Sequence, residues 1–356
     1  MDYLSPKLLS AVKKMGFSKL TPVQEQSIPL IKQGKNLLVQ SKTGTGKTAA
    51  FAMPILESLK ENKKLQVVVI EPTRELAIQV GNDFRKIGAE LNFGVVVAYG
   101  GTPDDRQKKL LADGANILVG TQDRVLDLIS SGDAKLSNVS VIVLDEADVL
   151  LGRDMFGRTN KIMHSVPANC QKLFFCVHLP KALEETVEKM LVSFEKVKTF
   201  AGEDKRVDEL KHDVVFVDSA DKFKELCKLL ESSGKTIVFC KTKDSCTELN
   251  QSLIKKGFLD TRIIHGDFDQ TRRNSAIASF KKNIRILVAT DVVARGLHVP
   301  GVDLVINYEL PQNYDYYLHR IGRTGRMSIP GRVVTLVSPE DSRRWKEIKN
   351  KAGITE

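Results

Sequence analysis

The sequence predicts an α/β protein with two tandem units, each a parallel sheet flanked by helices. Short apolar runs rich in valine, isoleucine and leucine alternate with longer helical or loop segments. This alternation occurs twice, and the polar stretch Ala201–Glu209 separates the two series. We therefore place a short linker there and expect domains at residues 1–203 and 204–356.

The strand candidates are continuous apolar runs, as expected for parallel strands that are buried on both faces. In the first series the first run leads into a glycine-rich turn, and the apolar segment Thr48–Leu59 after that turn is typical of a helix. The candidates of this series are Asn36–Gln40, Val67–Glu71, Val95–Tyr99, Ile117–Gly120, Val141–Asp145 and Lys172–Cys176. Those of the second series are Val214–Val217, Thr236–Phe239, Thr261–Ile264, Ile286–Ala289, Leu304–Asn307 and Val333–Val337.

The composition suits a folded protein with two cores, because 42% of the 356 residues are hydrophobic and 28% are charged. The net charge of +10 suits a polyanionic partner such as nucleic acid. The five cysteines form no CxxC pair, so neither zinc nor a disulfide framework is indicated. The chain has no apolar run that could span a bilayer, and its start lacks the apolar core of a secretory signal. We expect a cytoplasmic or nuclear protein, or an organellar one if a transit peptide has been removed.

The stretch SKTGTGKT, Ser41–Thr48, is a phosphate-binding loop in its local context. Gly44 and Gly46 let the backbone curl so that amide N–H groups converge on phosphate oxygens, in front of a helix N-terminus. Lys47 adds a cation, and Thr48 adds a hydroxyl for magnesium. The loop begins with Ser41 where the usual pattern has glycine, but the strand before it and the helix after it are both present. A glycine-rich turn without a ligand is the alternative.

The stretch VLDEAD, Val143–Asp148, completes the prediction of a nucleotide site. A buried strand ends there in acidic residues, which is where an α/β sheet places its ligands. Asp145 is suited to hold magnesium, and Glu146 to orient or deprotonate an attacking water. An exposed acidic loop is the alternative. Since the second series lacks a phosphate loop, we expect both units to share one nucleotide and to close around it.

With these motifs the chain resembles a DEAD-box RNA helicase of superfamily 2 over nearly its full length. The DEAD tetrapeptide itself is present at Asp145–Asp148, and the other matching motifs follow in the family's order. They are GFSKLTPVQ (Gly16–Gln24), PTRELA (Pro72–Ala77), the pair Gly100 and Gly101, ATDVVARG (Ala289–Gly296) and HRIGRTGR (His319–Arg326). The resemblance implies two RecA-like domains, the first with the ATP-binding motifs and the second with arginine fingers.

The resemblance also implies ATP and Mg²⁺ as cofactors. Gln24 would read adenine, because an amide offers both a donor and an acceptor. The arginine fingers Arg323 and Arg326 would join Lys47, Asp145 and Glu146 in catalysis, whereas a solvated basic turn is the alternative for them. Thr48 and Asp145 would hold the metal. The nucleotide-binding residues would be Gln24, Ser41, Thr43, Gly44, Thr45, Gly46, Lys47, Thr48, Asp148, Asp291 and Gly296.

An RNA track is implied on both domains, on the face opposite the nucleotide. Its hydroxyls, arginines and backbone N–H groups would grip the sugar-phosphate chain, so binding should be independent of sequence and sensitive to salt. RNA rather than DNA follows from the resemblance alone. The residues are Thr73, Arg74, Gly100, Gly101, Thr121 and Arg124, with Thr242, Arg273, Thr290 and Arg295 in the second domain.

Three departures from the family pattern bear on activity. Cys176, Val177 and His178 stand where the family has Ser-Ala-Thr, whose hydroxyls bind the DEAD aspartate and couple hydrolysis to strand separation. A thiol is a weak donor, so Asp148 loses a good partner unless His178 replaces it, which would make activity depend on pH. Asp123 replaces a glycine in TQDR and predicts a weaker grip on RNA. His298 replaces the aspartate that ends ARGxD and predicts weaker ATP binding or closure.

The leading hypothesis is therefore an RNA-stimulated ATPase that unwinds short RNA duplexes locally. The alternative is an ATP-gated RNA clamp or assembly scaffold with weak or no unwinding, because the coupling motif is altered. A DNA helicase is disfavoured by the DEAD motif and Gln24 together. We expect a monomer, with protein partners supplying specificity and no membrane association.

Overall fold

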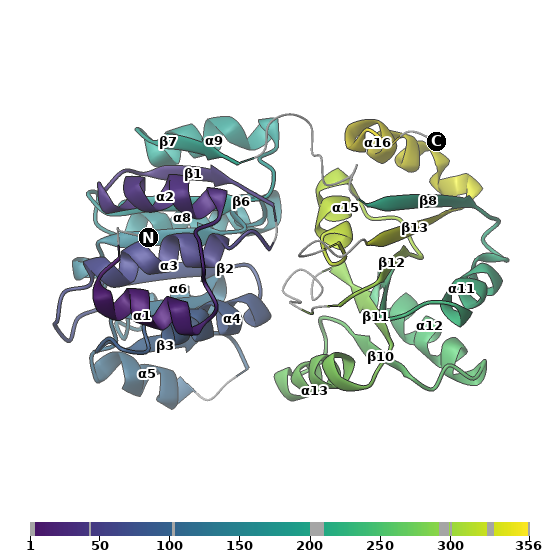
Figure 1. Cartoon of the computed structure of the whole chain (residues 1–356), viewed down its shortest axis with the longest axis horizontal. Coiled ribbons are helices and arrows are strands. Elements are labelled where there is room, and N and C mark those ends of the chain that lie inside the picture. Colours follow the sequence, from purple (N-terminus) through teal and green to yellow (C-terminus); the bar gives the residue numbers. More distant parts are fainter. Residues whose placement is uncertain are drawn as a thin grey trace. The chain divides into compact units, whose positions relative to one another are not determined.

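A computed structural model describes residues 4–42, 44–101, 104–199, 210–291, 299, 301–325 and 331–354. The chain divides into two compact units, Met1–Ala201 and Gly202–Glu356, and each is built on one parallel sheet (Figure 1). The two-unit α/β fold predicted from the sequence is therefore confirmed. The stretch predicted as the linker lies outside the described residues. In the described part of the chain, no helix is long and apolar enough to cross a membrane.

The sheet of unit 1 has seven strands in the order β3-β4-β2-β5-β6-β1-β7, and its pairs are parallel. The six strands predicted for this unit are all present. The edge strand β7 was not predicted, because Val197 is its only buried residue and the others are exposed Glu and Lys. The strands are β1 (Leu37–Gln40), β2 (Val67–Glu71), β3 (Val95–Ala98), β4 (Ile117–Thr121), β5 (Val141–Asp145), β6 (Gln171–Cys176) and β7 (Glu195–Lys198).

Helices cover both faces of this sheet, and a separate apolar core fills each interface. Val80, Phe84 and Ile87 lie three or four residues apart and are all buried, which is why α4 packs one stripe on the sheet. The helix after the phosphate loop, α3, is instead buried all round its middle. The helices are α1 (Pro6–Lys14), α2 (Pro22–Lys32), α3 (Lys47–Ser58), α4 (Arg74–Ile87), α5 (Asp104–Ala112), α6 (Gln122–Ser130), α7 (Ala147–Leu150), α8 (Arg153–Ser165) and α9 (Lys181–Leu191), with the 3-10 helix η1 (Leu136–Asn138).

Unit 2 has a six-stranded sheet in the order β10-β11-β9-β12-β13-β8, again with parallel pairs and a core on each face. Tyr317 and Trp345 meet edge to face at 5.9 Å between ring centroids and join α15 to α16. The strands are β8 (Lys211–Phe216), β9 (Thr236–Cys240), β10 (Thr261–Ile264), β11 (Ile286–Thr290), β12 (Leu304–Asn307) and β13 (Arg332–Val337). The helices are α11 (Lys222–Glu231), α12 (Lys243–Lys255), α13 (Gln270–Lys282), α15 (Tyr314–Ile321) and α16 (Ser342–Ala352), with η2 (Pro339–Asp341).

Candidate nucleotide site and nucleic-acid track

The glycine-rich loop links the end of β1 to the start of α3. Gly44 and Gly46 have φ of +77° and +90°, the left-handed region that favours glycine. Gly46 is also needed for space, because a Cβ there would lie 2.4 Å from Nε2 of Gln24. The loop therefore requires glycine at positions 44 and 46, and it leads directly to the N–H groups of the first turn of α3, which have no partner within the helix.

Gln24 is buried and ties the start of α2 to this loop. Its Nε2 donates to the Gly46 carbonyl at 3.2 Å, and its Oε1 accepts from the Thr21 N–H at 3.0 Å. Both ends of the amide are therefore engaged within the protein. Its role in reading adenine remains a prediction.

The Lys47 ammonium binds backbone carbonyls of the same loop. Its Nζ donates to the carbonyls of Ser41 at 2.8 Å and Lys42 at 3.0 Å. Burial lowers the pKa of Lys47, while Asp145 and Glu146 act to raise it. The predicted cation therefore lies within electrostatic reach of both predicted carboxylates.

The acidic end of β5 is buried and strained. Burial raises the pKa of Asp145 to about 6, against the lowering effect of Lys47. Glu146 has φ +52°, and this left-handed conformation costs a non-glycine residue about 1–2 kcal/mol. The Glu146 N–H donates to Oδ1 of Asp145 at 3.0 Å. Strain of this kind at a sheet edge is typical of functional positions.

The donor set here suits a magnesium ion that is held jointly with a nucleotide. Within the described ranges, no group of three or more His, Cys, Asp or Glu residues is arranged to hold a metal. Magnesium commonly takes one or two protein oxygens and completes its shell with phosphate and water. Asp145 and Thr48 can supply those oxygens, so the residues present suit a magnesium ion.

The structure adds one acidic residue to this region that was not predicted as functional. Glu71 ends β2, the strand beside β5, and is fully buried. Burial and the charges of Asp145 and Glu146 raise its pKa well above the usual range. The only signal in the sequence is a carboxyl at the end of the apolar run VVVIE.

Two of the three departures lie among the described residues. Cys176 is buried at the end of β6, and its Sγ donates to the Val39 carbonyl at 3.8 Å. Burial raises the pKa of this thiol, so it stays neutral. The His178 side chain is exposed. Asp123 is exposed in the first turn of α6, where its Oδ2 pairs with Arg158 Nη1 at 3.2 Å.

The predicted RNA residues of unit 1 follow the ends of β2, β3 and β4. Thr73 caps α4 by accepting the Leu76 N–H at 3.3 Å. The Arg74 guanidinium lies against the glycine pair, since Cβ atoms at Gly100 and Gly101 would come within 3.4 and 3.1 Å of its nitrogens. Thr121 is the residue before α6, and the Arg124 Nε donates to Gln107 Oε1 at 2.8 Å.

The strand order separates these residues from the nucleotide residues within unit 1. Strands β3, β4 and β2 are neighbours and carry the predicted RNA residues. Strands β5, β6 and β1 are neighbours too, and they carry the acidic motif, Cys176 and the phosphate loop. Both sets lie at the carboxyl edge of one sheet, where parallel α/β sheets place ligands.

In unit 2 the predicted RNA residues also follow three adjacent strands. Thr242 follows β9 and caps α12 by accepting the Ser245 N–H at 3.1 Å, Thr290 ends β11, and Arg273 lies on α13 after β10. Strands β10, β11 and β9 are adjacent. The buried Arg273 guanidinium donates to the Gly266 carbonyl, so it is held by its own unit.

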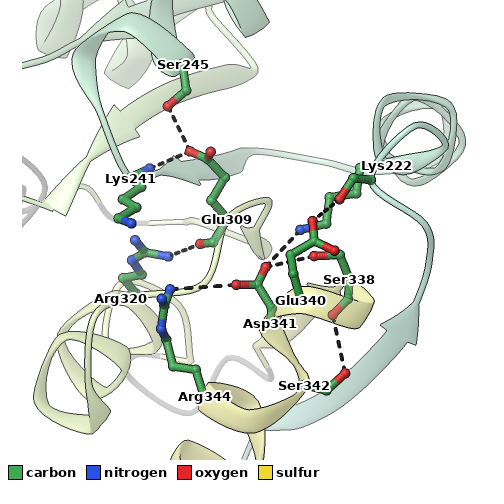
Figure 2. A network of polar contacts seen from close by, with 11 residues as sticks. Lys222, Lys241, Ser245, Glu309, Arg320, Ser338, Glu340, Asp341, Ser342 and Arg344 are labelled. Carbon is green, nitrogen blue, oxygen red and sulfur yellow. Dashed lines mark hydrogen bonds and ion pairs between the residues drawn. The ribbon is translucent and has the colours of Figure 1, made fainter.

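Arg320, which was not predicted as functional, lies on α15 beside Glu309 (Figure 2). Its guanidinium is 1% exposed and pairs with both carboxylate oxygens of Asp291, at 2.5 and 2.8 Å. It also donates to the Glu309 carbonyl at 2.6 Å and lies over the Phe239 ring at 4.9 Å. Glu309 in turn accepts from the Lys241 N–H at 2.7 Å and the Ser245 hydroxyl at 2.8 Å.

Arg323 follows this helix and is buried, and its Nε donates to the His319 carbonyl at 3.0 Å. Asp291, predicted to shape the same region, is the ion-pair partner of Arg320. The predicted residues Thr43, Arg295, Gly296, His298 and Arg326 lie outside the described residues.

A parallel α/β unit with a phosphate loop, and an acidic strand end within electrostatic reach of the loop's lysine, defines a nucleoside triphosphate-binding protein of the P-loop class. Comparison with known proteins then gives the family. Residues 21–186 match the family model "DEAD/DEAH box helicase", and residues 221–328 match "Helicase conserved C-terminal domain".

The chain is 39% identical over 350 residues to the DEAD-box ATP-dependent RNA helicase CshA of Bacillus subtilis, an alignment that covers 97% of this chain and 70% of CshA. It is 40% identical to CshA of Geobacillus kaustophilus over 342 residues, which are 95% of this chain and 73% of that protein. The chain therefore belongs to the DEAD-box ATP-dependent RNA helicase family, as its motifs predicted.

Solved structures agree with this assignment. S. cerevisiae Dbp5 bound to RNA and ADP BeF3 matches with a TM-score of 0.91 and 28% identity, over 99% of this chain and 93% of that one. Mss116p bound to ssRNA and AMP-PNP matches with a TM-score of 0.88 and 26% identity, over 99% of this chain and 76% of that one. The predicted RecA-like architecture is thus the one that these helicases share.

Proposed function

We propose that this chain is an RNA-stimulated ATPase that unwinds short RNA duplexes locally, with closure of its two units coupled to sequence-independent RNA binding. The observation that carries the proposal is the convergence of Lys47, Asp145 and Glu146. These residues come from a loop and a strand end far apart in sequence, and each carboxylate acts on the pKa of the lysine. The RNA-bound and nucleotide-bound structures of Dbp5 and Mss116p support both ligands.

The chain's own residues account for binding of the triphosphate. The N–H groups at the start of α3 would bind phosphate oxygens, and Lys47 would leave the carbonyls of Ser41 and Lys42 for the phosphates. Thr48 and Asp145 would hold Mg²⁺, which neutralises phosphate charge in such sites. Glu146 would accept a proton from the attacking water or orient it.

Arg323 and Arg326 complete this proposal from unit 2. A guanidinium at the γ-phosphate stabilises transition-state charge, so hydrolysis would depend on closure of the units. Replacing Arg323 with alanine should lower the hydrolysis rate by about a thousandfold with little change in ADP affinity. Single-turnover hydrolysis together with ADP titration measures both quantities. An unchanged rate would exclude Arg323 as a finger.

RNA binding would use the carboxyl ends of β3, β4 and β2 in unit 1 and of β10, β11 and β9 in unit 2. The predicted donors there are backbone N–H groups, hydroxyls and arginines, which contact phosphate and sugar rather than bases. Affinity should therefore fall steeply with salt and vary little with RNA sequence. We expect a monomer that gains specificity from protein partners. The bacterial relatives favour the cytoplasm over a nucleus.

A second function, an ATP-gated RNA clamp or assembly scaffold, is favoured by the state of Cys176. Its weak S–H donor is engaged with the Val39 carbonyl, so the coupling contact to Asp148 that the family's serine makes is weakened. Hydrolysis would then separate fewer strands, or none.

Parallel assays on one preparation separate the two functions. RNA-stimulated ATP hydrolysis and displacement of a short labelled strand would be measured under the same conditions. Hydrolysis with displacement supports the helicase, whereas ATP-dependent RNA retention without displacement supports the clamp. The variant Cys176→Ser serves as the matched comparison, since gain of displacement on restoring a hydroxyl would identify the thiol as the cause.

A further inference from the structure

The carboxyl of Glu71 is buried, and the part of the chain that the structure describes offers it no hydrogen-bond partner. Both of its oxygens are inaccessible and have no hydrogen-bond partner among the described residues, and Oε2 of Glu146 is in the same state. A buried polar group without a partner is costly, so its presence in a well-packed sheet calls for a ligand or a catalytic role. The proposed hydrolysis mechanism gives Glu71 no role, although its buried carboxyl calls for one.

The strand register places Glu71 beside the catalytic carboxylates. Ile70 on β2 pairs with Leu144 on β5, so the next residues, Glu71 and Asp145, end neighbouring strands. Side chains alternate along a strand, and Val69 and Val143 face the core beneath α3 and α4. Glu71 and Asp145 therefore point to the side of the sheet where Lys47 begins α3.

The charges around Glu71 are all negative. Asp145, Glu146 and Asp83 act on it, and no cation or hydrogen-bond donor among the described residues offsets them. A buried water molecule can link two carboxyl groups by hydrogen bonds to both. Since Glu71 and Glu146 each have a buried oxygen without a partner among the described residues, one water between them would satisfy both.

We propose that Glu71 is a positioning residue for hydrolysis, which orients the Glu146 carboxylate toward the attacking water through a bridging water molecule. This rests on the proposed ATPase function. Glu71 also directly precedes Pro72, Thr73 and Arg74, so the same strand end carries a predicted RNA contact and this carboxyl. Oε2 of Glu146 has no hydrogen-bond partner among the described residues, so such a water would hold its carboxylate in place.

Two substitutions test the proposal, Glu71→Gln and Glu71→Leu. Both remove an unpartnered buried carboxyl, so each variant should melt at a temperature no lower than the parent's. The turnover number with saturating RNA should fall by about tenfold or more, with the Michaelis constant for ATP and ADP affinity within about twofold of the parent. The matched control is Asp83→Asn, which removes another acid that acts on Glu71 and should leave turnover unchanged.

A second readout needs no turnover. Binding of ADP with aluminium fluoride, which mimics the transferring phosphoryl group, should weaken about tenfold in both variants, while ADP binding should not. Melting temperatures that fall in both variants together with ADP affinity would show a structural role and overturn the proposal. Turnover and aluminium fluoride binding within about twofold of the parent would overturn it as well.

Failure of the proposed function is a separate result. If the parent chain shows no ATP hydrolysis with RNA, the ATPase assignment fails whatever the variants do. Glu71 is then judged by aluminium fluoride binding alone, in which equal affinity for the parent and both variants contradicts the proposal. If Glu71→Leu does not fold, Glu71→Gln decides, because its amide can donate to the neighbouring carboxylates.

Discussion

The buried charged groups at the carboxyl edges of the two sheets differ in whether they have hydrogen-bond and ion-pair partners. In unit 1 the carboxyls of Asp145 and Glu146 lie within electrostatic reach of Lys47, and Glu71 ends the strand beside Asp145. Both oxygens of Glu71 and one of Glu146 have no hydrogen-bond partner in the described part of the chain. In unit 2 the buried Arg320 is bound by Asp291 and Asn307 and lies over an aromatic ring. It also donates to the Glu309 carbonyl (Figure 2). The first arrangement is suited to receive a charged ligand, whereas the second stabilises the fold.

The predicted RNA residues are nevertheless placed alike in the two sheets, because in both units they follow three adjacent strands. In unit 1 the neighbouring strands carry the phosphate loop and the acidic motif. In unit 2 the predicted nucleotide residue Asp291 instead follows β11, one of the three strands with predicted RNA residues, and α15 follows β12. The units thus differ in where nucleotide residues are predicted and in the charge chemistry at the strand ends.

The largest effect is expected on ATP hydrolysis, from a change in the phosphate loop of unit 1. Lys47→Ala should lower ATP hydrolysis by about a hundredfold to a thousandfold, because it removes a cation placed for the phosphates. Steady-state hydrolysis with saturating RNA measures it. Lys243→Ala is the control in unit 2, since this exposed lysine pairs only with Asp267 in the described structure. If both variants lost hydrolysis rate to a similar extent, the phosphate-binding role would not be specific to the lysine of unit 1.

The next effect tests the satisfied charge of unit 2. Arg320→Leu leaves Asp291, whose side chain is only 13% exposed, without its cation and should lower the free energy of unfolding by about 3–5 kcal/mol. Denaturant-induced unfolding measures it. The control Arg332→Leu breaks the more exposed pair with Asp213 and should cost about 0–1 kcal/mol. If both variants cost the same, Arg320 does not have the structural role described here.

The unsatisfied charge of unit 1 predicts a dependence of stability on pH. The pKa of Glu71 is raised in the folded state, so between its unfolded value, about 4.3, and its folded value the folded chain holds a proton that the unfolded chain releases. Stability contributed by Glu71 therefore falls as pH rises through this window. We therefore expect the melting temperature of Glu71→Gln, minus that of the parent, to rise by several degrees from about pH 4.5 to pH 8 in the absence of nucleotide and magnesium. A constant difference over this range contradicts the assignment.

The smallest effect concerns the RNA side of unit 1. Asp123→Asn should tighten RNA binding by about twofold to fivefold at low salt, because it removes a negative charge beside the predicted phosphate path. Asparagine is preferable to glycine, since residue 123 lies inside the first turn of α6 and glycine would weaken the helix. The control is Asp127→Asn, an exposed change on the same helix. Fluorescence anisotropy with a short RNA measures both, and equal affinities for Asp123→Asn and the parent would remove this departure as a cause of weak binding.

The candidate site was predictable where local sequence sets it. The loop Ser41–Thr48 and the carboxylates Asp145 and Glu146 were found because glycine conformations and strand ends are local features. Glu309 was missed because it looks like an ordinary charged residue in the sequence, and Arg320, although inside the motif HRIGRTGR, was given no role. Their significance arises from contacts with Lys241 and Asp291, which follow the strands β9 and β11.

The sequence by itself determined the two parallel α/β units, the phosphate loop and the family. These follow from apolar runs and glycine spacing, whose physical effects act within a few residues. Only the tertiary structure decided that β2 lies beside β5, so that Glu71 ends next to Asp145. Strand order depends on how whole helices and sheets bury their apolar faces, and short-range spacing does not encode which carboxyl is left without a partner.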